Sequence, residues 1–153
     1  ADAGGALRDE ALAVFYERWR HDPLVLDKWF AVQATSKRED TLSRVERLMG
    51  HRDFTLTNPN RVRSLVGAFC TANQLRFHAA SGAGYRFLRE RVLELDPVNP
   101  QIASRLLQAM VRWRRFDPGR QVQMRAELER ILDVEELSKD VYEVAAKGLS
   151  DAA

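Results

Sequence analysis

The sequence predicts an all-α fold in which about eight antiparallel helices pack in pairs to form a right-handed superhelix. Three observations support this prediction. Apolar residues recur three and four positions apart along most of the 153 residues. Four helix starts carry an Asp or Asn directly before a proline. The alternation of polar and apolar residues that is typical of strands is confined to residues 53–57, which we expect to form an extended link.

The first half of the chain is predicted to contain four helices. Asp22 and Asn58 each precede a proline, so that the side chain caps the first turn and the proline occupies it. Gly50 stands just after the third apolar segment, where a helix C-terminus favours glycine. The first helix is expected to end near Arg20, and the second to run from Pro23 to about Ala34. The third is expected to follow Ser36 and to end before Gly50, and the fourth to begin at Pro59.

The second half of the chain contains the same helix-start signals. Asn99 and Asp117 precede prolines, and Ser138 is a capping residue without a proline. The expected elements are a short helix or turn within residues 73–79, a helix over residues 82–95, and helices starting at Pro100, at Pro118 and after Ser138, the last running to Leu149. A compact bundle and a solenoid of helix pairs both fit, and the similar helix lengths favour an ARM- or HEAT-like solenoid.

Composition excludes several classes of protein. Hydrophobic residues make up 45% and charged residues 30%, as in globular chains, and no run approaches the roughly 20 apolar residues of a membrane helix. The opening residues have no signal-peptide pattern. The single cysteine, Cys70, lies in an apolar helical setting and is expected to be a small buried residue. A chain without an internal disulfide fits a reducing compartment.

Motifs for catalysis or metal binding are absent from the sequence. His21, His51 and His78 each stand alone, without the H-E-x-x-H spacing that brings two imidazoles to one zinc ion. His21 and His51 flank helix ends, and we expect them to lie at the surface or to cap those ends. We expect His78 to be partly buried or to line a groove. No phosphate-binding glycine loop or nucleophile elbow occurs. The chain alone is therefore not predicted to be an enzyme.

Arginines near aromatic residues raise the question of nucleic-acid binding. These arginines are Arg61, Arg63, Arg112, Arg114 and Arg115. The last three are expected in the final turn of their helix, where cations are favoured. With 24 Lys and Arg against 22 Asp and Glu, the net charge is only +2, so we expect no nucleic-acid partner.

A polar pair occurs in the segment DPVNPQIASRLLQAM. Gln101 and Arg105 lie one turn apart, and Gln108 and Arg112 continue their face beside an apolar row. Spacing alone leaves open whether this face is merely solvated or contacts a ligand.

Long segments of the chain closely resemble the C-terminal region of bacterial aminopeptidase N, a family of gluzincin zinc peptidases. The segments are FYERWRHDPLVLDKWFAVQA, LMGHRDFTLTNPNRVRSLVGAF, FHAASGAGYRFLRERVLELDPVNPQIASRLLQ and RRFDPGRQVQMRAELERI. The resemblance implies a non-catalytic helical domain that closes the substrate chamber of an enzyme removing N-terminal residues from peptides. It implies zinc in that enzyme's catalytic domain and no cofactor in this chain.

The resemblance also implies an organisation and partners. Residues 1–10 are expected to be a flexible edge or linker, residues 11–149 the C-terminal half of the helical domain, and residues 150–153 a tail. The partners would be the catalytic and β domains of the same polypeptide and peptide substrates, with no nucleic acid and no membrane, in the cytoplasm. The alternative is a free-standing α-solenoid scaffold that binds a peptide or protein on its concave face.

Site residues carry over from the family at four positions. The resemblance implies that Gln101 borders the pocket for the first substrate residue and that Arg105 lies on the same chamber-facing side. Gln108 and Arg61 are possible chamber-wall residues. Arg61 has a second interpretation, in which it anchors its loop against a neighbouring helix, and we prefer this one.

Overall fold

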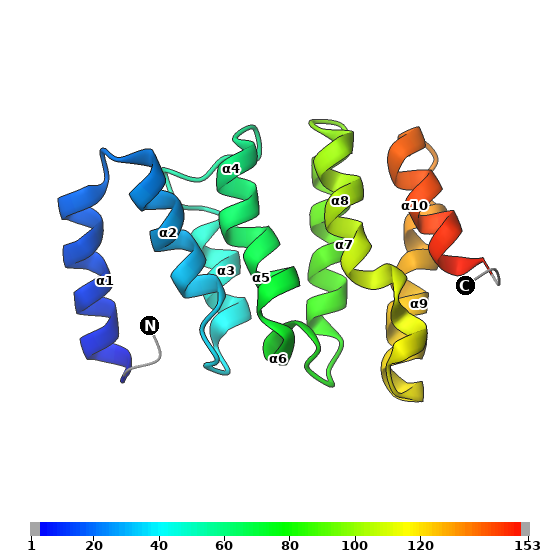
Figure 1. Cartoon of the computed structure of the whole chain (residues 1–153), viewed down its shortest axis with the longest axis horizontal. Coiled ribbons are helices and arrows are strands. Elements are labelled where there is room, and N and C mark those ends of the chain that lie inside the picture. The colour runs from blue at the N-terminus through cyan, green and yellow to red at the C-terminus, as the bar shows by residue number, and fades with distance from the viewer. Residues whose placement is uncertain (1–3, 151–153) are drawn as a thin grey trace. The chain divides into compact units, whose positions relative to one another are not determined.

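The computed structural model describes residues 4–150, and every regular element in them is helical (Figure 1). The chain divides into two compact units, residues 1–76 and 77–153. The elements are α1 (Gly5–Trp19), α2 (Pro23–Ala34), α3 (Thr41–Leu48), α4 (Pro59–Val62), η1 (Arg63–Gly67), α5 (Ala68–Ala72), α6 (Gln74–Phe77), α7 (Ala83–Leu95), α8 (Pro100–Val111), η2 (Trp113–Arg115), α9 (Pro118–Leu132) and α10 (Lys139–Leu149). The all-α prediction is confirmed.

Side-chain caps fix where the helices begin. Asp22, Asn58, Asn99, Asp117 and Ser138 each accept a hydrogen bond from a backbone N–H in the first turn of the helix that follows. In all but the last case a proline occupies the first helical position. Each cap satisfies an N–H that has no partner within the helix, which stabilises it by about 1 kcal/mol. The predicted helix starts at these five positions are confirmed.

Two predicted boundaries differ from the structure. Residues 5–10 belong to α1 and are not a linker. Helix α3 begins at Thr41 and not just after Ser36. The Ser36 carbonyl accepts hydrogen bonds from the Thr41 hydroxyl at 3.0 Å and the Asn73 amide at 2.8 Å. These buried side chains occupy the acceptor that a helix would use internally, so the chain stays irregular between α2 and α3.

The helical segment of residues 59–72 contains a wider turn at its centre. Here α4 passes directly into the π-helix η1, and η1 into α5. Leu65, Val66 and Gly67 of the wider turn are buried. The Thr71 hydroxyl donates to the Gly67 carbonyl at 2.7 Å, which supplies a partner to an acceptor near the point where the winding changes.

Aromatic rings form the core of the first unit. Trp29 and Phe30 of α2 meet edge to face at 5.0 Å, and the ring of His51 contacts both of them and Tyr16 of α1. Trp29 also donates its indole N–H to the Leu12 carbonyl at 2.9 Å. Edge-to-face pairs of this kind add about 0.5–1.5 kcal/mol to the burial of the rings. His51 follows the end of α3, as expected, but it is half-buried and its ring belongs to this aromatic cluster.

The second unit is built from α7, α8, α9 and α10. Its fully buried side chains include Leu88, Leu107, Met124 and Leu128, one from α7, one from α8 and two from α9. Asp96, at the C-terminal end of α7, accepts a hydrogen bond from the Ser138 N–H at 2.8 Å. The start of α10 is thereby tied to the end of α7.

Gly84 allows the closest backbone approach in the second unit. A Cβ atom at this position would lie 2.2 Å from the Phe77 carbonyl oxygen, well inside van der Waals contact. The first turn of α7 therefore packs against residue 77 only because residue 84 has no side chain.

We expect Gly84→Ala to destabilise the chain by at least about 2 kcal/mol, since the backbone at residue 77 or residue 84 must move. Gly119→Ala is the matched control, because its Cβ would lie 3.4 Å from the nearest atom, a side-chain oxygen of Asp117. Urea unfolding followed by circular dichroism measures both. Equal midpoints for the two variants would contradict the close approach.

Candidate functional site on helix α8

Helix α8 owes its orientation to its cap and its apolar residues. The Asn99 side chain accepts from the Ile102 N–H at 3.2 Å, and Pro100 starts the helix. The buried residues of α8 are Ile102, Ala103, Leu106, Leu107 and Met110. They recur every three or four positions and pack against α7 and α10. The opposite side of α8 consequently faces solvent.

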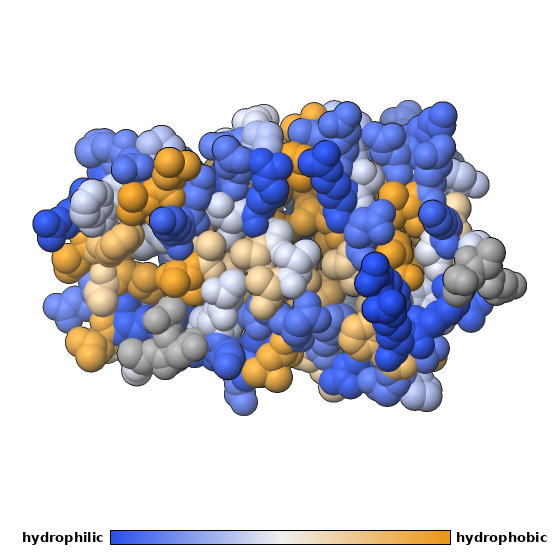
Figure 2. Space-filling view, in the orientation of Figure 1, coloured by the Kyte–Doolittle hydropathy of each residue, from blue (hydrophilic) through white to orange (hydrophobic). Residues whose placement is uncertain are grey.

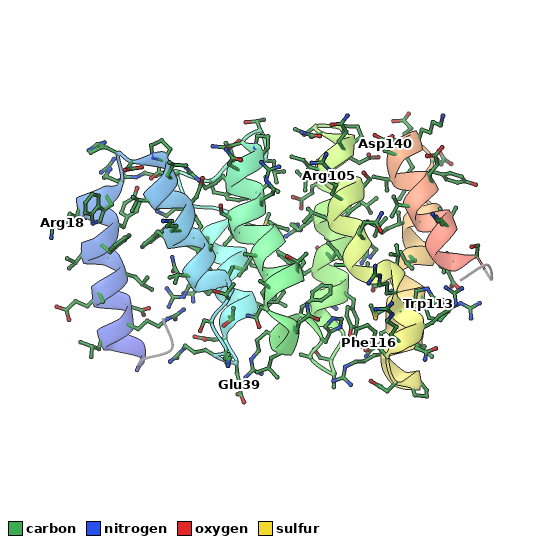
Figure 3. The ribbon with its side chains drawn as sticks, in the orientation of Figure 1. Arg18, Glu39, Arg105, Trp113, Phe116 and Asp140 are labelled. Carbon is green, nitrogen blue, oxygen red and sulfur yellow. The ribbon has the colours of Figure 1, made fainter. Side chains whose placement is uncertain are left out.

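The exposed side of α8 carries the polar row expected from the sequence. Gln101, Arg105, Gln108 and Arg112 are all exposed, and their spacing of four, three and four places them along one side of the helix axis. Figure 3 labels Arg105 on the first half of α8 and Trp113 just after its end. The structure therefore places three of the four predicted site residues, Gln101, Arg105 and Gln108, on one surface.

Arg105 differs from most arginines of the second unit in having no partner. Arg89, Arg91, Arg120 and Arg130 each pair with a carboxylate. Within residues 4–150, by contrast, nothing forms a hydrogen bond or ion pair with the Arg105 guanidinium. An exposed guanidinium keeps five donors in a fixed planar arrangement, which suits carboxylates and peptide carbonyls. Arg105 is thus free to bind a ligand.

A groove of about 680 Å³ continues this surface at the C-terminal end of α8. Gln108 lines it from α8, Arg112 from the residue that follows α8, and Glu143 and Lys147 from α10. Arg114 and Arg115 of η2 complete the wall, so that four cations and one carboxylate are found among its described lining residues. The groove favours acidic or carbonyl-rich ligands.

The base of the groove is held by η2. The Trp113 indole N–H donates to the Gly148 carbonyl at 2.9 Å, and the Arg114 guanidinium lies 4.2 Å from the Trp113 ring centroid. Arg114 also donates to the carbonyls of Gly148, at 3.1 Å, and Ser150. Its charge is therefore used to hold the end of α10. The expectation that the arginines at 112, 114 and 115 lie in the last turn of α8 is wrong, because α8 ends at Val111.

Arg61 has the contacts of an anchor. It is 6% exposed, and its Nε donates to the Asp27 carboxylate at 2.7 Å. Its Nη1 donates to the Asp53 carbonyl, and its guanidinium lies 5.3 Å from the Phe30 ring centroid. These contacts tie the loop before α4 to α2. The Nε and Nη1 donors of the guanidinium are therefore engaged inside the first unit.

The remaining candidates have structural partners. Cys70 is buried, as predicted. His78 is partly buried, also as predicted, with Nδ1 2.7 Å from the Tyr85 hydroxyl and its ring stacked on Phe116 at 4.4 Å. Burial, followed by repulsion from Arg120, lowers the pKa of His78. In the part of the chain that the structure describes, no group of three or more His, Cys, Asp or Glu is placed to hold a metal ion.

Two residues that line the groove, Glu143 and Lys147, were not predicted from the sequence. Glu143 and Lys147 reach the groove because α10 packs beside α8, a contact between segments more than thirty residues apart. Their separation of four residues, which places them on one side of α10, was the only signal available.

The fold defines a helical-repeat domain in which α8 presents an exposed polar face. The chain belongs to the family described as "Domain of unknown function (DUF3458_C) ARM repeats", whose model matches residues 1–150. This match supports the solenoid over the compact bundle. No helix within residues 4–150 has the length and apolar character needed to cross a membrane.

Relatives of known name are aminopeptidases. The chain is 49% identical over 142 residues to aminopeptidase N of Haemophilus influenzae and 50% identical over 146 residues to that of Caulobacter vibrioides. It is 46% identical over 143 residues to aminopeptidase N of Escherichia coli. These matches cover 93%, 95% and 94% of the chain but only 16%, 17% and 16% of the relatives. The resemblance to aminopeptidase N is confirmed, and the chain spans about one-sixth of the relatives' length.

A solved structure supports the same assignment. The crystal structure of Legionella pneumophila aminopeptidase A in complex with aspartic acid matches with a TM-score of 0.88 and 38% sequence identity. The match covers 92% of this chain and 16% of that protein. The helical fold is therefore shared with a part of a much longer peptidase.

We expect Arg61→Met to destabilise the chain by about 3 kcal/mol, because it leaves the largely buried Asp27 carboxylate and the Asp53 carbonyl without their donor. Arg63→Met is the control, since Arg63 is exposed and bonds only to Asn60, three residues away. Its effect should stay within about 0.5 kcal/mol. Chemical denaturation of both variants measures the free energy of unfolding. Similar losses in the two variants would contradict the anchoring role.

Proposed function

We propose that this chain is the non-catalytic helical domain of a zinc-dependent aminopeptidase, and that the exposed face of α8 borders the chamber in which the substrate peptide is held. The observation that supports this most strongly is 46–50% identity to three aminopeptidases N over almost the whole chain. The enzyme's activity, its peptide substrates and a cytoplasmic location belong to this proposal.

The chain's own residues do not fit a zinc site. No cluster of three potential ligands exists within residues 4–150, and the three histidines are separated from one another in the sequence. Zinc would be held by the catalytic domain, and no chemical step passes through a residue of this chain. We propose that the catalytic and β domains of the same polypeptide are its partners.

The role of α8 is then to position the substrate. The Gln101 side chain offers one carbonyl acceptor and two N–H donors, which suit the first side chain or the backbone of a peptide. Arg105, one turn later, offers an unpaired cation to a peptide carbonyl or carboxylate. Enclosing walls restrict access to peptides that fit and hold the reacting bond in place. Gln108 extends the same wall toward the basic groove.

The alternative function, a free-standing scaffold, is less well supported. Each of the three relatives is about six times as long as the matched region. The scaffold alternative would be favoured if the reading frame of this chain encoded no H-E-x-x-H segment upstream of residue 1.

We expect the 153-residue chain to hold no stoichiometric zinc and to leave alanine p-nitroanilide unhydrolysed, because no residue of the described chain can activate water through a metal. Metal analysis by mass spectrometry and a chromogenic assay measure this. A zinc-dependent turnover by the purified chain would sink the proposal that catalysis lies elsewhere.

In the intact enzyme, we expect Gln101→Ala to change the ratio of kcat/KM values among alanine, arginine and leucine p-nitroanilides by about tenfold, since a lost hydrogen bond to a substrate group costs 1 kcal/mol or more. Zinc content should stay the same. Gln74→Ala is the control, because Gln74 is exposed and bonds only to the carbonyl of Thr71. Unchanged ratios in Gln101→Ala would rule out a pocket role for Gln101.

A further inference from the structure

Helix α1 leaves most of its apolar residues uncovered. Of its fifteen residues only Arg8 and Tyr16 are buried. Leu7 is 70% exposed, and Phe15 and Trp19 are each 41% exposed. A helix with apolar residues on several sides is typical of one packed between neighbours. In the first unit α1 packs against α2, and it also contacts Arg44 of α3 and His51.

A groove of about 510 Å³ runs between α1 and α2. Leu7, Phe15, Trp29 and Val32 line it with apolar atoms, and Arg8 and Lys28 are its charged residues. Figure 2 shows hydrophobic side chains gathered over these two helices. The groove thus combines an apolar surface with positive charge, and none of the described residues that line it carries a carboxylate.

Arg8 is a buried cation without a partner. It is 3% exposed, and its Nε, Nη1 and Nη2 atoms have no hydrogen-bond acceptor within residues 4–150. The nearby carboxylates are already engaged. Asp9 accepts from Arg44 at 2.5 Å, and Asp40 accepts from Arg38 at 3.1 Å. Burial, followed by repulsion from Arg44 and Arg38, lowers the pKa of Arg8. A buried guanidinium left in this state is destabilising unless an acceptor is supplied from outside the described residues.

We propose that this groove, defined as the surface of Leu7, Arg8, Phe15, Lys28, Trp29 and Val32, receives an amphipathic helix from the preceding part of the longer polypeptide, and that this helix supplies a carboxylate to Arg8. Three arguments identify the occupant. The relatives are about six times as long as the matched region. The family is one of ARM repeats, in which each helix pair buries its apolar face against the next pair. The positive charge of the groove selects an acidic helix.

A second copy of the chain is a poorer occupant. A symmetric dimer through this groove would bring each Arg8 and Lys28 close to their own counterparts. No carboxylate among the described lining residues offsets this repulsion. Charge therefore favours a different segment with acidic residues.

The first test compares α1 in two contexts by hydrogen exchange. Backbone amides of α1 should exchange at least about tenfold more slowly in the full-length polypeptide than in the 153-residue chain, because the docked helix suppresses local opening. Phe15→Ser should remove this protection in the full-length polypeptide, whereas Leu24→Ser, which is 73% exposed and outside the groove, should leave it intact. Equal exchange of α1 in both contexts overturns the proposal.

The second test is whether Arg8→Met has opposite effects on stability in the 153-residue chain and in the full-length polypeptide. In the 153-residue chain Arg8→Met removes an unpaired buried charge, so Tm should rise by about 2 °C or more. In the full-length polypeptide the same change leaves the partner carboxylate unpaired, so α1 amides should exchange faster. Arg86→Met, an exposed position on α7, should change neither quantity. A lower Tm for Arg8→Met in the short chain overturns the proposal, as does a dimer in sedimentation that Phe15→Ser dissociates.

The two tests are independent of the proposed role of α8. The substrate preference of Gln101→Ala reports on the chamber, whereas exchange of α1 reports on the docked helix. Failure of either proposal therefore leaves the other standing.

Discussion

Side-chain capping hydrogen bonds in the first turns of α2, α4, α8, α9 and α10 fix where these helices begin, and thereby the direction in which their side chains point. For α8 this bond joins the Asn99 side chain to the Ile102 N–H, and Pro100 fixes the first backbone angle. Once the first turn is fixed, the helical period assigns each later residue to the buried or the exposed side. The cap and the apolar residues of α8 favour the same rotation of the helix about its axis. In this rotation Gln101 and Arg105 are exposed.

The arginines of this chain differ in whether their guanidinium has a carboxylate partner. Arg61 and Arg89 are paired with Asp27 and Glu127, and their charges hold distant segments together. Arg105 has no partner within residues 4–150, but it is exposed, so water solvates its charge at little cost. For Arg8 the missing partner is costly, because its guanidinium is buried.

The positions of the helices could be read from the sequence, because caps and apolar periodicity are local signals. The delayed start of α3 could not, since it depends on Asn73, which reaches the Ser36 carbonyl from 37 residues away. The role of Arg61 remained open for the same reason, because its partner Asp27 lies 34 residues away. The exposed row of α8 was predictable from spacing, whereas the groove beside it required the packing of α10 on α8. Caps and helical periodicity can be recognised in the sequence, whereas contacts between residues far apart in the chain cannot.

The exposed faces of α1 and α8 differ in what they require of a partner. The face of α8 is polar and solvated, so it is stable without a ligand, and a peptide can enter and leave it at little cost. The groove between α1 and α2 is apolar and holds a buried unpaired charge, so it is unfavourable when empty. A surface of the first kind suits a substrate that is released after each reaction. A surface of the second kind suits a permanent contact, which is what a neighbouring helix in a repeat array provides.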